Sequence, residues 1–263
     1  MKYTTQQGTA CLKNMNKYLK NLEKIEFVLT NACTGRCKHC SAGAHEGAVE
    51  RIDPRLCADA VRKIAGEYNI KTVMVFGGEP LLHPDAVEEI MSAARDMNVQ
   101  RRQVITNGFF TTDREKIKEV AERLYLSGVN DLLLSVDAFH QETIPLGVVR
   151  AFAEEIIKAG VPLRLQPAWL VSPDDGNPYN EKTRELLESF SDLAVAIGEG
   201  NVVFPEGNAV KYLSEYFTDS APQNPYVEDP CDIKCISFSS DGGVLGGNMY
   251  TKDVLKIIEE YTP

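Results

Sequence analysis

The sequence lacks any long hydrophobic run. No apolar stretch approaches the ~18 residues that a membrane-spanning helix requires, and the N-terminal segment has no apolar core of the kind found in a signal peptide. An N-x-S/T glycosylation acceptor is also missing. We therefore expect a cytoplasmic protein that does not bind a membrane, in a compartment where thiols stay reduced.

Positive charge is also scarce. The chain has 28 Lys and Arg against 38 Asp and Glu, which gives a formal net charge of −10 and a pI near 5.0. Non-specific nucleic-acid binding relies on basic surface and is therefore not expected, although a ligand of nucleotide size remains compatible. Walker A, G-x-S-x-G and H-E-x-x-H motifs are absent, and Gly198-Glu-Gly200 is too short for a dinucleotide fingerprint.

Short apolar runs alternate with helical patterns along most of the 263 residues. Six such runs read as strands: 25–30, 71–76, 103–106, 131–136, 162–168 and 201–205. Helical patterns occupy Asp53–Glu67, His83–Met97, Thr112–Leu126 and Asn180–Phe190. Runs such as VMVF lack polar alternation, which indicates a parallel sheet covered on both faces.

This alternation predicts an α/β fold. Six βα units over about 185 residues fall short of the ~250 residues of a closed eightfold barrel, so we expect a partial (β/α)6 TIM-like barrel that is open on one side. Helix-start signals include Asp53 before Pro54 and a capping box from Thr112 to Glu115. We divide the chain into an N-terminal arm or helix (1–21), the barrel (22–210) and a C-terminal hairpin-plus-helix extension (211–263).

Cysteine is used sparingly, yet three of the seven cysteines lie within eight residues. Cys33, Cys37 and Cys40 follow the first apolar run with the spacing C-x3-C-x2-C. Disulfides would leave one thiol over, and zinc would need a fourth ligand such as His39 or His45. Three thiolates suit a metal centre with one open coordination position. Of the other cysteines, we interpret Cys11 as an ordinary thiol and Cys57 as a packed helix residue.

The cysteine loop, with His39 at the usually aromatic position, is similar to the signature of the radical S-adenosylmethionine (SAM) enzymes. A second motif of that family, GGEP, occurs as Gly77 to Pro80 directly after the second apolar run. The resemblance covers roughly residues 22–210. It implies a [4Fe-4S] cluster and SAM as cofactors, reductive cleavage of SAM to a 5′-deoxyadenosyl radical, and a one-electron donor such as a flavodoxin or ferredoxin.

The resemblance also implies roles for individual residues at the strand ends, where α/β barrels place their chemistry. Cys33, Cys37 and Cys40 are the expected cluster ligands. The expected SAM-binding residues are Gly77, Gly78, Glu79 and Pro80 at the amino group, Thr106 and Asn107, then Ser135 and Asp137 at the ribose or carboxylate, and Arg164 at the carboxylate. Asp137 could instead be a strand-end cap and Arg164 part of a salt bridge. His140 is a candidate proton donor or acceptor, with a structural role as the alternative. The sixth run leads into Pro205–Ala209, also at a strand end.

The tail resembles a truncated auxiliary-cluster extension of the SPASM or twitch type. Cys231 and Cys235 precede ISFSSDGGVL, which predicts a hairpin with Asp241-Gly242 at its turn. No further cysteines follow, so we expect no auxiliary cluster. Residues 251–261 are predicted to form a closing amphipathic helix.

Two hypotheses for function follow. The first is a radical SAM enzyme that abstracts hydrogen from a ribosomal peptide or a small metabolite. The second is a non-catalytic iron–sulfur or zinc-binding protein on a decayed version of the same fold. Both would take up metal, but only the enzyme would consume SAM.

Overall fold

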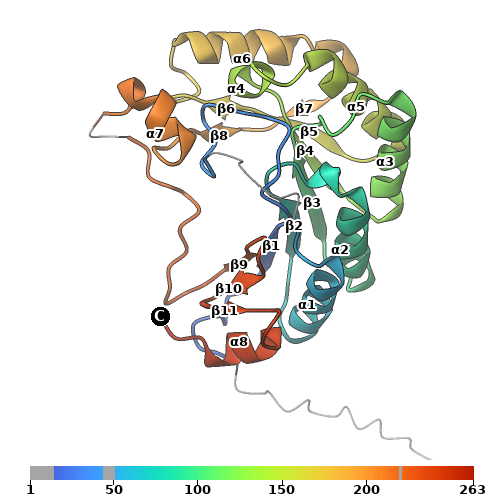
Figure 1. Ribbon diagram of the computed structural model, residues 1–263, viewed down its shortest axis with the longest axis vertical. Helices are drawn as coiled ribbons and strands as arrows, with labels where there is room; N and C mark the ends of the chain where they lie inside the picture. The colour runs from blue at the N-terminus through green and yellow to red at the C-terminus, as the bar shows by residue number, and fades with distance from the viewer. Residues whose placement is uncertain (1–14, 44–50, 219–220) are drawn as a thin grey trace, which may run out of the picture.

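The computed structural model describes residues 15–43, 51–218 and 221–263. Its centre is a curved, seven-stranded parallel sheet with the order β7-β5-β4-β3-β2-β1-β9 (Figure 1). The strands are β1 (Lys24–Val28), β2 (Thr72–Phe76), β3 (Arg101–Thr106), β4 (Asp131–Ser135), β5 (Leu163–Gln166), β7 (Ala196–Ile197) and β9 (Cys235–Phe238). This arrangement confirms the predicted α/β partial barrel.

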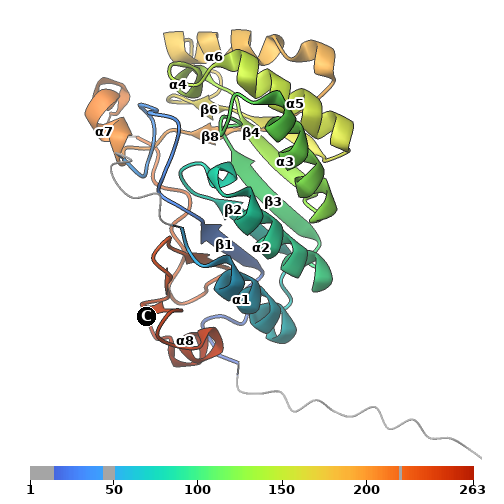
Figure 2. The same cartoon turned by 45° about the vertical axis from the view of Figure 1, so that its right-hand side comes forward.

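Helices cover the convex face of the sheet, and Figure 2 shows α1, α2, α3 and α5 lying across it. The helices are α1 (Pro54–Glu67), α2 (Pro84–Asp96), α3 (Arg114–Leu126), α4 (Ala138–Gln141), α5 (Leu146–Ala159), α6 (Pro178–Glu188), α7 (Asn208–Tyr212) and α8 (Val254–Glu260). Alternate strand residues such as Ile25 and Phe27 are fully buried in the core beneath these helices. Their neighbours Lys24 and Glu26 therefore face the concave side.

The predicted helix starts were partly right. Asp53 caps α1, and its side chain accepts a hydrogen bond from the Arg55 backbone N–H. The capping box at Thr112 was wrong, because Asp113 caps α3 and accepts from the N–H groups of Glu115 and Lys116. A carboxylate is among the preferred N-caps, and it takes this position one residue later.

The sixth predicted strand does not join the main sheet. Its residues form β8 (Asn201–Val202), which pairs with β6 (Ala168–Trp169), while β7 lies beside β5. Pro167 separates β5 from β6 and has no N–H for the ladder. The chain turns after β7 through Gly200, whose φ is +81° and whose added Cβ would lie 2.5 Å from the Pro167 carbonyl oxygen. The main sheet therefore ends at a two-residue edge strand.

The tail also differs from the prediction. The predicted hairpin at 236–245 was right in its turn at Asp241-Gly242, where the Gly242 N–H donates to the Ser239 carbonyl and the Ser239 N–H to the Gly243 carbonyl. Its strand pairing was wrong, because β9 pairs in parallel with β1, and the antiparallel pair is β10 (Gly243–Val244) with β11 (Gly247–Asn248). Burial explains the difference, since Ile236 and Phe238 are at most 1% exposed. The rings of Phe27 and Phe238 stack with centroids 4.8 Å apart. The tail thus completes one edge of the barrel sheet.

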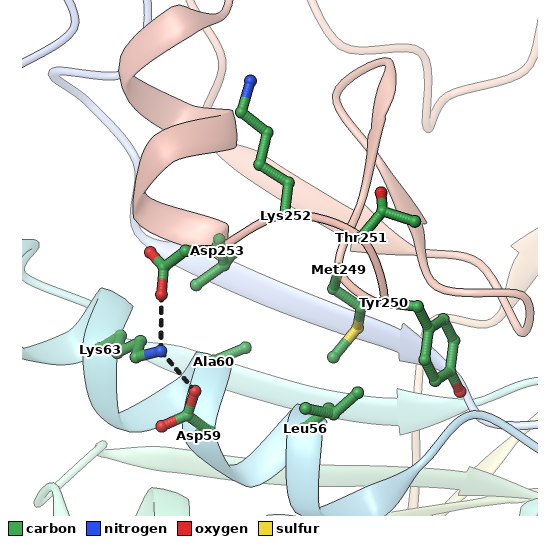
Figure 3. Close-up of a pocket in the computed structure, with 10 residues that line it drawn as sticks. Leu56, Asp59, Ala60, Lys63, Met249, Tyr250, Thr251, Lys252 and Asp253 are labelled. Atoms are coloured by element: carbon green, nitrogen blue, oxygen red, sulfur yellow. Dashed lines mark hydrogen bonds and ion pairs between the residues drawn. The ribbon is translucent and has the colours of Figure 1, made fainter.

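The last helix was predicted correctly, and α8 packs close to α1 in Figure 3. The Lys63 ammonium lies 2.7 Å from carboxylate oxygens of both Asp59 and Asp253. A shallow pocket between α1 and the tail, lined by residues including Leu56, Met249 and Tyr250, lies on this outer side of the barrel. Across the described ranges, no helix is both long and apolar enough to cross a membrane.

Candidate functional site

The loop that follows β1 is joined to the loop that follows β2. The Gly78 N–H donates to the Thr30 carbonyl at 2.7 Å, and the Glu79 N–H donates to the Ala32 carbonyl at 2.8 Å. A Cβ on Gly78 would lie 2.1 Å from the Ala32 oxygen, so a side chain here would push the two loops apart. The GGEP segment and the cysteine loop therefore form one structural unit.

The three thiols of the cysteine loop lie in a setting suited to metal. The Cys33 sulfur accepts hydrogen bonds from the Gly35 N–H at 3.4 Å and from the Asn107 side-chain amide at 3.6 Å. Burial, reinforced by the charges of Glu79 and Cys40, raises the pKa of Cys33 to about 11 despite the hydrogen bond from Gly35. Burial raises the pKa of Cys37 as well, with Asp137, Cys33 and Cys40 adding to the effect.

The Cys33 and Cys37 thiols therefore carry protons at neutral pH unless a cation displaces them. Metal binding deprotonates coordinating thiols, and N–H groups directed at sulfur stabilise the resulting thiolates. Three sulfur donors, of which Cys33 receives N–H hydrogen bonds, suit an iron–sulfur cluster with one iron left open. The residues fit the cluster that the resemblance implies.

Two histidines lie beside the cysteine loop. Within the described part of the chain, Cys37, His39 and His140 are the potential metal ligands whose ligand atoms all lie within 4.8 Å of one another. The His39 ring lies 4.9 Å from that of Phe139 and 4.8 Å from that of His140. Its Nδ1 is buried without a hydrogen-bond partner. Burial and the neighbouring His140 lower the pKa of His39 to about 4, so this imidazole is neutral.

Glu79 fastens the end of β2 to the end of β3. Its side chain is fully buried and accepts from the Thr106 hydroxyl at 2.7 Å, the Asn107 N–H at 2.8 Å and the Leu81 N–H at 2.9 Å. Burial raises the pKa of Glu79 to about 7, although these hydrogen bonds act in the opposite direction. Pro80, also buried, begins the short 3-10 helix η1 (Pro80–Leu82). Thr106 and Asn107 are thus joined to the GGEP segment, as their predicted common site requires.

Asp137, which is fully buried, and His140, whose side chain is 17% exposed, form a pair at the end of β4. Asp137 caps α4 by accepting from the His140 N–H at 2.9 Å, and its second oxygen lies 2.8 Å from His140 Nδ1. Burial opposes ionisation of both groups. Their attraction prevails, so the pKa of Asp137 lies below its usual range and that of His140 above it. Asp137 therefore acts as the strand-end cap that the sequence left open, and Ser135 is buried as the last residue of β4.

Arg164 is not brought to this cluster of residues. Its guanidinium lies 2.8 Å from both carboxylate oxygens of Asp131. Asp131 is the first residue of β4 and Ser135 the last, so the ion pair lies at the opposite ends of the strands from the cysteine loop. This is the salt bridge that the sequence left as the alternative.

Sequence reasoning missed two supports of the cysteine loop. The Arg36 N–H donates to the Thr143 hydroxyl at 3.1 Å, from the connection between α4 and α5. Asn208, at the start of α7, donates to backbone carbonyls of the loop. Asn208 lies in the Pro205–Ala209 segment, and its position after an apolar run was a signal of its proximity but not of its contacts. His45 and Cys11 lie outside the described residues.

Comparisons with known proteins agree with this site. A family model described as the radical SAM superfamily matches residues 27–161, which is 135 of the 263 residues. A probable GTP 3′,8-cyclase of Saccharolobus solfataricus is 26% identical over 221 residues, covering 77% of this chain and 67% of the relative. One from Methanocaldococcus jannaschii is 25% identical over 127 residues, covering 48% and 40%.

Solved structures share the fold. "Native anSMEcpe with bound AdoMet" superposes with a TM-score of 0.57 at 14% sequence identity, over 92% of this chain and 81% of that chain. The same protein with AdoMet and the Cp18Cys peptide gives a TM-score of 0.55. With the family match spanning the end of β1, the cysteine loop, GGEP and strands β2 to β4, this chain belongs to the radical SAM superfamily, and it is an enzyme whose cofactors are a [4Fe-4S] cluster and SAM.

Proposed function

We propose that this enzyme generates a 5′-deoxyadenosyl radical that abstracts a hydrogen atom from a substrate bound at the concave side of the barrel. The observation that carries the proposal is the joining of the cysteine loop to the GGEP segment through the Gly78 and Glu79 N–H groups. That contact puts the three thiols beside the GGEP segment, and it depends on the two glycines, because a Cβ on Gly77 or Gly78 would lie 2.5 Å or less from a backbone oxygen of the loop after β1. A protein that merely bound iron would need the cysteine loop but not the GGEP segment.

Cys33, Cys37 and Cys40 hold the cluster in this proposal. When bound, the cluster supplies the electron that cleaves the sulfonium of SAM, and an external flavodoxin or ferredoxin replaces that electron. The Gly35 and Asn107 N–H groups hold the Cys33 sulfur in place. The protein's own contribution is to fix the three sulfurs, exclude water and orient SAM.

The SAM pocket is formed by the strand ends around this loop. Gly77 and Gly78 allow close approach of the SAM amino group, while Glu79, fixed by Thr106 and Asn107, sets the shape of that wall. Ser135 and the Asp137–His140 pair form the neighbouring wall. Because Asp137 engages Nδ1 of His140, Nε2 is the ring nitrogen that remains to exchange a proton with a ligand. Arg164 takes no part.

The substrate is a ribosomal peptide or a small metabolite. The relatives at 25–26% identity are named for a reaction of GTP, which favours a small metabolite and makes a nucleoside triphosphate the first compound to assay. The peptide-bound structural neighbour shares the fold alone at 14% identity.

Anaerobic reconstitution with iron and sulfide tests the proposal. We expect about four irons per chain and, after reduction with SAM present, formation of 5′-deoxyadenosine. Cys37→Ala should abolish both, because it removes one of three cluster ligands. Cys235→Ala is the matched control, since this half-buried thiol lies on β9 and should leave the iron count unchanged.

Two outcomes would contradict this account. Iron uptake without SAM binding by the reduced protein would favour the non-catalytic alternative. Loss of about four irons in Cys235→Ala, from a total near eight, would place a second cluster in the tail.

A further inference from the structure

Asn208 contacts the backbone of two of the three expected cluster ligands. Its backbone N–H donates to the Cys40 carbonyl at 2.9 Å, and its side-chain Nδ2 donates to the Cys37 carbonyl at 3.1 Å. The Cys40 N–H also donates to the Cys37 carbonyl, at 3.3 Å, which closes a turn between the two cysteines. One asparagine thus holds both ends of that turn.

The residue before it permits this contact. Gly207 has a φ of +55°, and an added Cβ would lie 2.4 Å from the Ser41 carbonyl oxygen and 2.5 Å from that of Cys40. The backbone at Gly207 therefore lies against the cysteine loop at a distance that only glycine allows. The residue after it, Ala209, is fully buried in a small apolar cluster that includes Cys37, Phe139 and Leu213. Asn208 is thus held in place by both of its neighbours, Gly207 and Ala209.

From these contacts we propose that Asn208 is a positioning residue for the iron–sulfur cluster, an inference that rests on the proposed function. Fixing the carbonyls of Cys37 and Cys40 fixes their peptide planes, and hence the directions from which their side chains leave the backbone. Cys33 is supported separately, by Gly35 and Asn107. Asn208 therefore sets the placement of two sulfurs relative to the third, much as outer-shell partners orient metal ligands elsewhere.

Three variants test this role. Asn208→Ala removes the side-chain bond to Cys37 and keeps the backbone bond to Cys40. Asn208→Asp keeps the shape but puts a carboxylate oxygen against the Cys37 carbonyl and a negative charge near the cluster. Asn201→Ala is the control, because Asn201 is nearby in sequence and its side-chain oxygen accepts from the Tyr226 hydroxyl instead.

The reconstituted proteins are compared by the rate of iron loss to a chelator and by the midpoint potential of the cluster. Loss of one hydrogen bond predicts about fivefold faster iron loss in Asn208→Ala. Asn208→Asp should lose iron faster still and have a lower midpoint potential, because added negative charge disfavours reduction. Asn201→Ala should match the wild type in both. Wild-type iron loss and potential in both Asn208 variants would overturn the inference.

A second measurement, on the iron-free protein, separates this inference from the proposed function. Hydrogen exchange at the Cys40 amide should be faster in Asn208→Ala than in the wild type or Asn201→Ala, because the turn that it closes is less well held. Unchanged exchange would overturn the positioning role. A wild type that takes up no iron would instead overturn the proposed function, and the exchange result would still stand for the loop.

Discussion

The Glu79 side chain has no exposed surface, accepts hydrogen bonds from three donors and has a pKa of about 7. Its folded-state pKa lies above the ordinary value of 4.5, so the folded chain favours the protonated form. The contribution to stability is therefore present at low pH and is lost as the pH rises through 7. The Glu79 contribution is thus lost at a pH where the Cys33 thiol, with a pKa of about 11, still carries its proton.

The pH dependence can be measured against Glu79→Gln, whose side chain does not titrate. With iron and SAM absent, we expect the unfolding free energy of the wild type, relative to the variant, to fall by about 3 kcal/mol between pH 4.5 and pH 8. Urea unfolding at several pH values checks this. Parallel pH profiles for the two proteins would show that Glu79 titrates as an ordinary carboxyl.

At the residue scale, the sequence predicted the groupings of residues that lie close together along the chain. The three cysteines within eight residues and the four consecutive GGEP residues could be recognised without knowledge of the fold. The pairing of Arg164 with Asp131 could not, because it depends on the register between β4 and β5. The Asp137–His140 pair depends on a four-residue helix, too short for a periodic signal.

At the scale of secondary structure, β9 is the element whose position matters most. It lies at the sheet edge beside β1, the strand that leads into the cysteine loop, and Phe238 stacks on Phe27. Phe238→Ala should lower the unfolding free energy by about 3–5 kcal/mol, because it removes a fully buried ring from a packed core. Val227→Ala provides the control, since Val227 is 76% exposed and should change little. Equal urea midpoints for the two variants would contradict the packing role of β9.

Sequence patterns identified most of these elements but not all of their partners. Buried runs such as 71–76 and 131–136 became central strands because both faces are covered. Short runs at the edges were ambiguous, since two to four residues of strand have several available neighbours. The tail run at 235–238 pairs with β1, more than 200 residues earlier, which no local pattern encodes.

The whole molecule is a partial barrel in which the first strand, β1, pairs with β9 from the C-terminal tail. The boundary between a barrel at 22–210 and an extension at 211–263 remains a prediction, and the pairing of β1 with β9 bears directly on it. A chain that ends at residue 230 would leave Ile25 and Phe27 without the strand beside them. We expect it to lose cooperative urea unfolding and to retain little iron after reconstitution. A shortened chain with the wild-type transition would show that the barrel folds alone.

The neighbouring positions of β1 and β9 have a consequence for how the protein is made. Phe27 leaves the ribosome 211 residues before Phe238, the residue on which it stacks. At roughly 5–20 residues per second, that interval is on the order of 10–40 s. During it, the cysteine loop is attached to an incomplete sheet and lacks Asn208, which is also synthesised late. We therefore expect insertion of the cluster to follow completion of the chain, with the three thiols depending on a reducing environment until then.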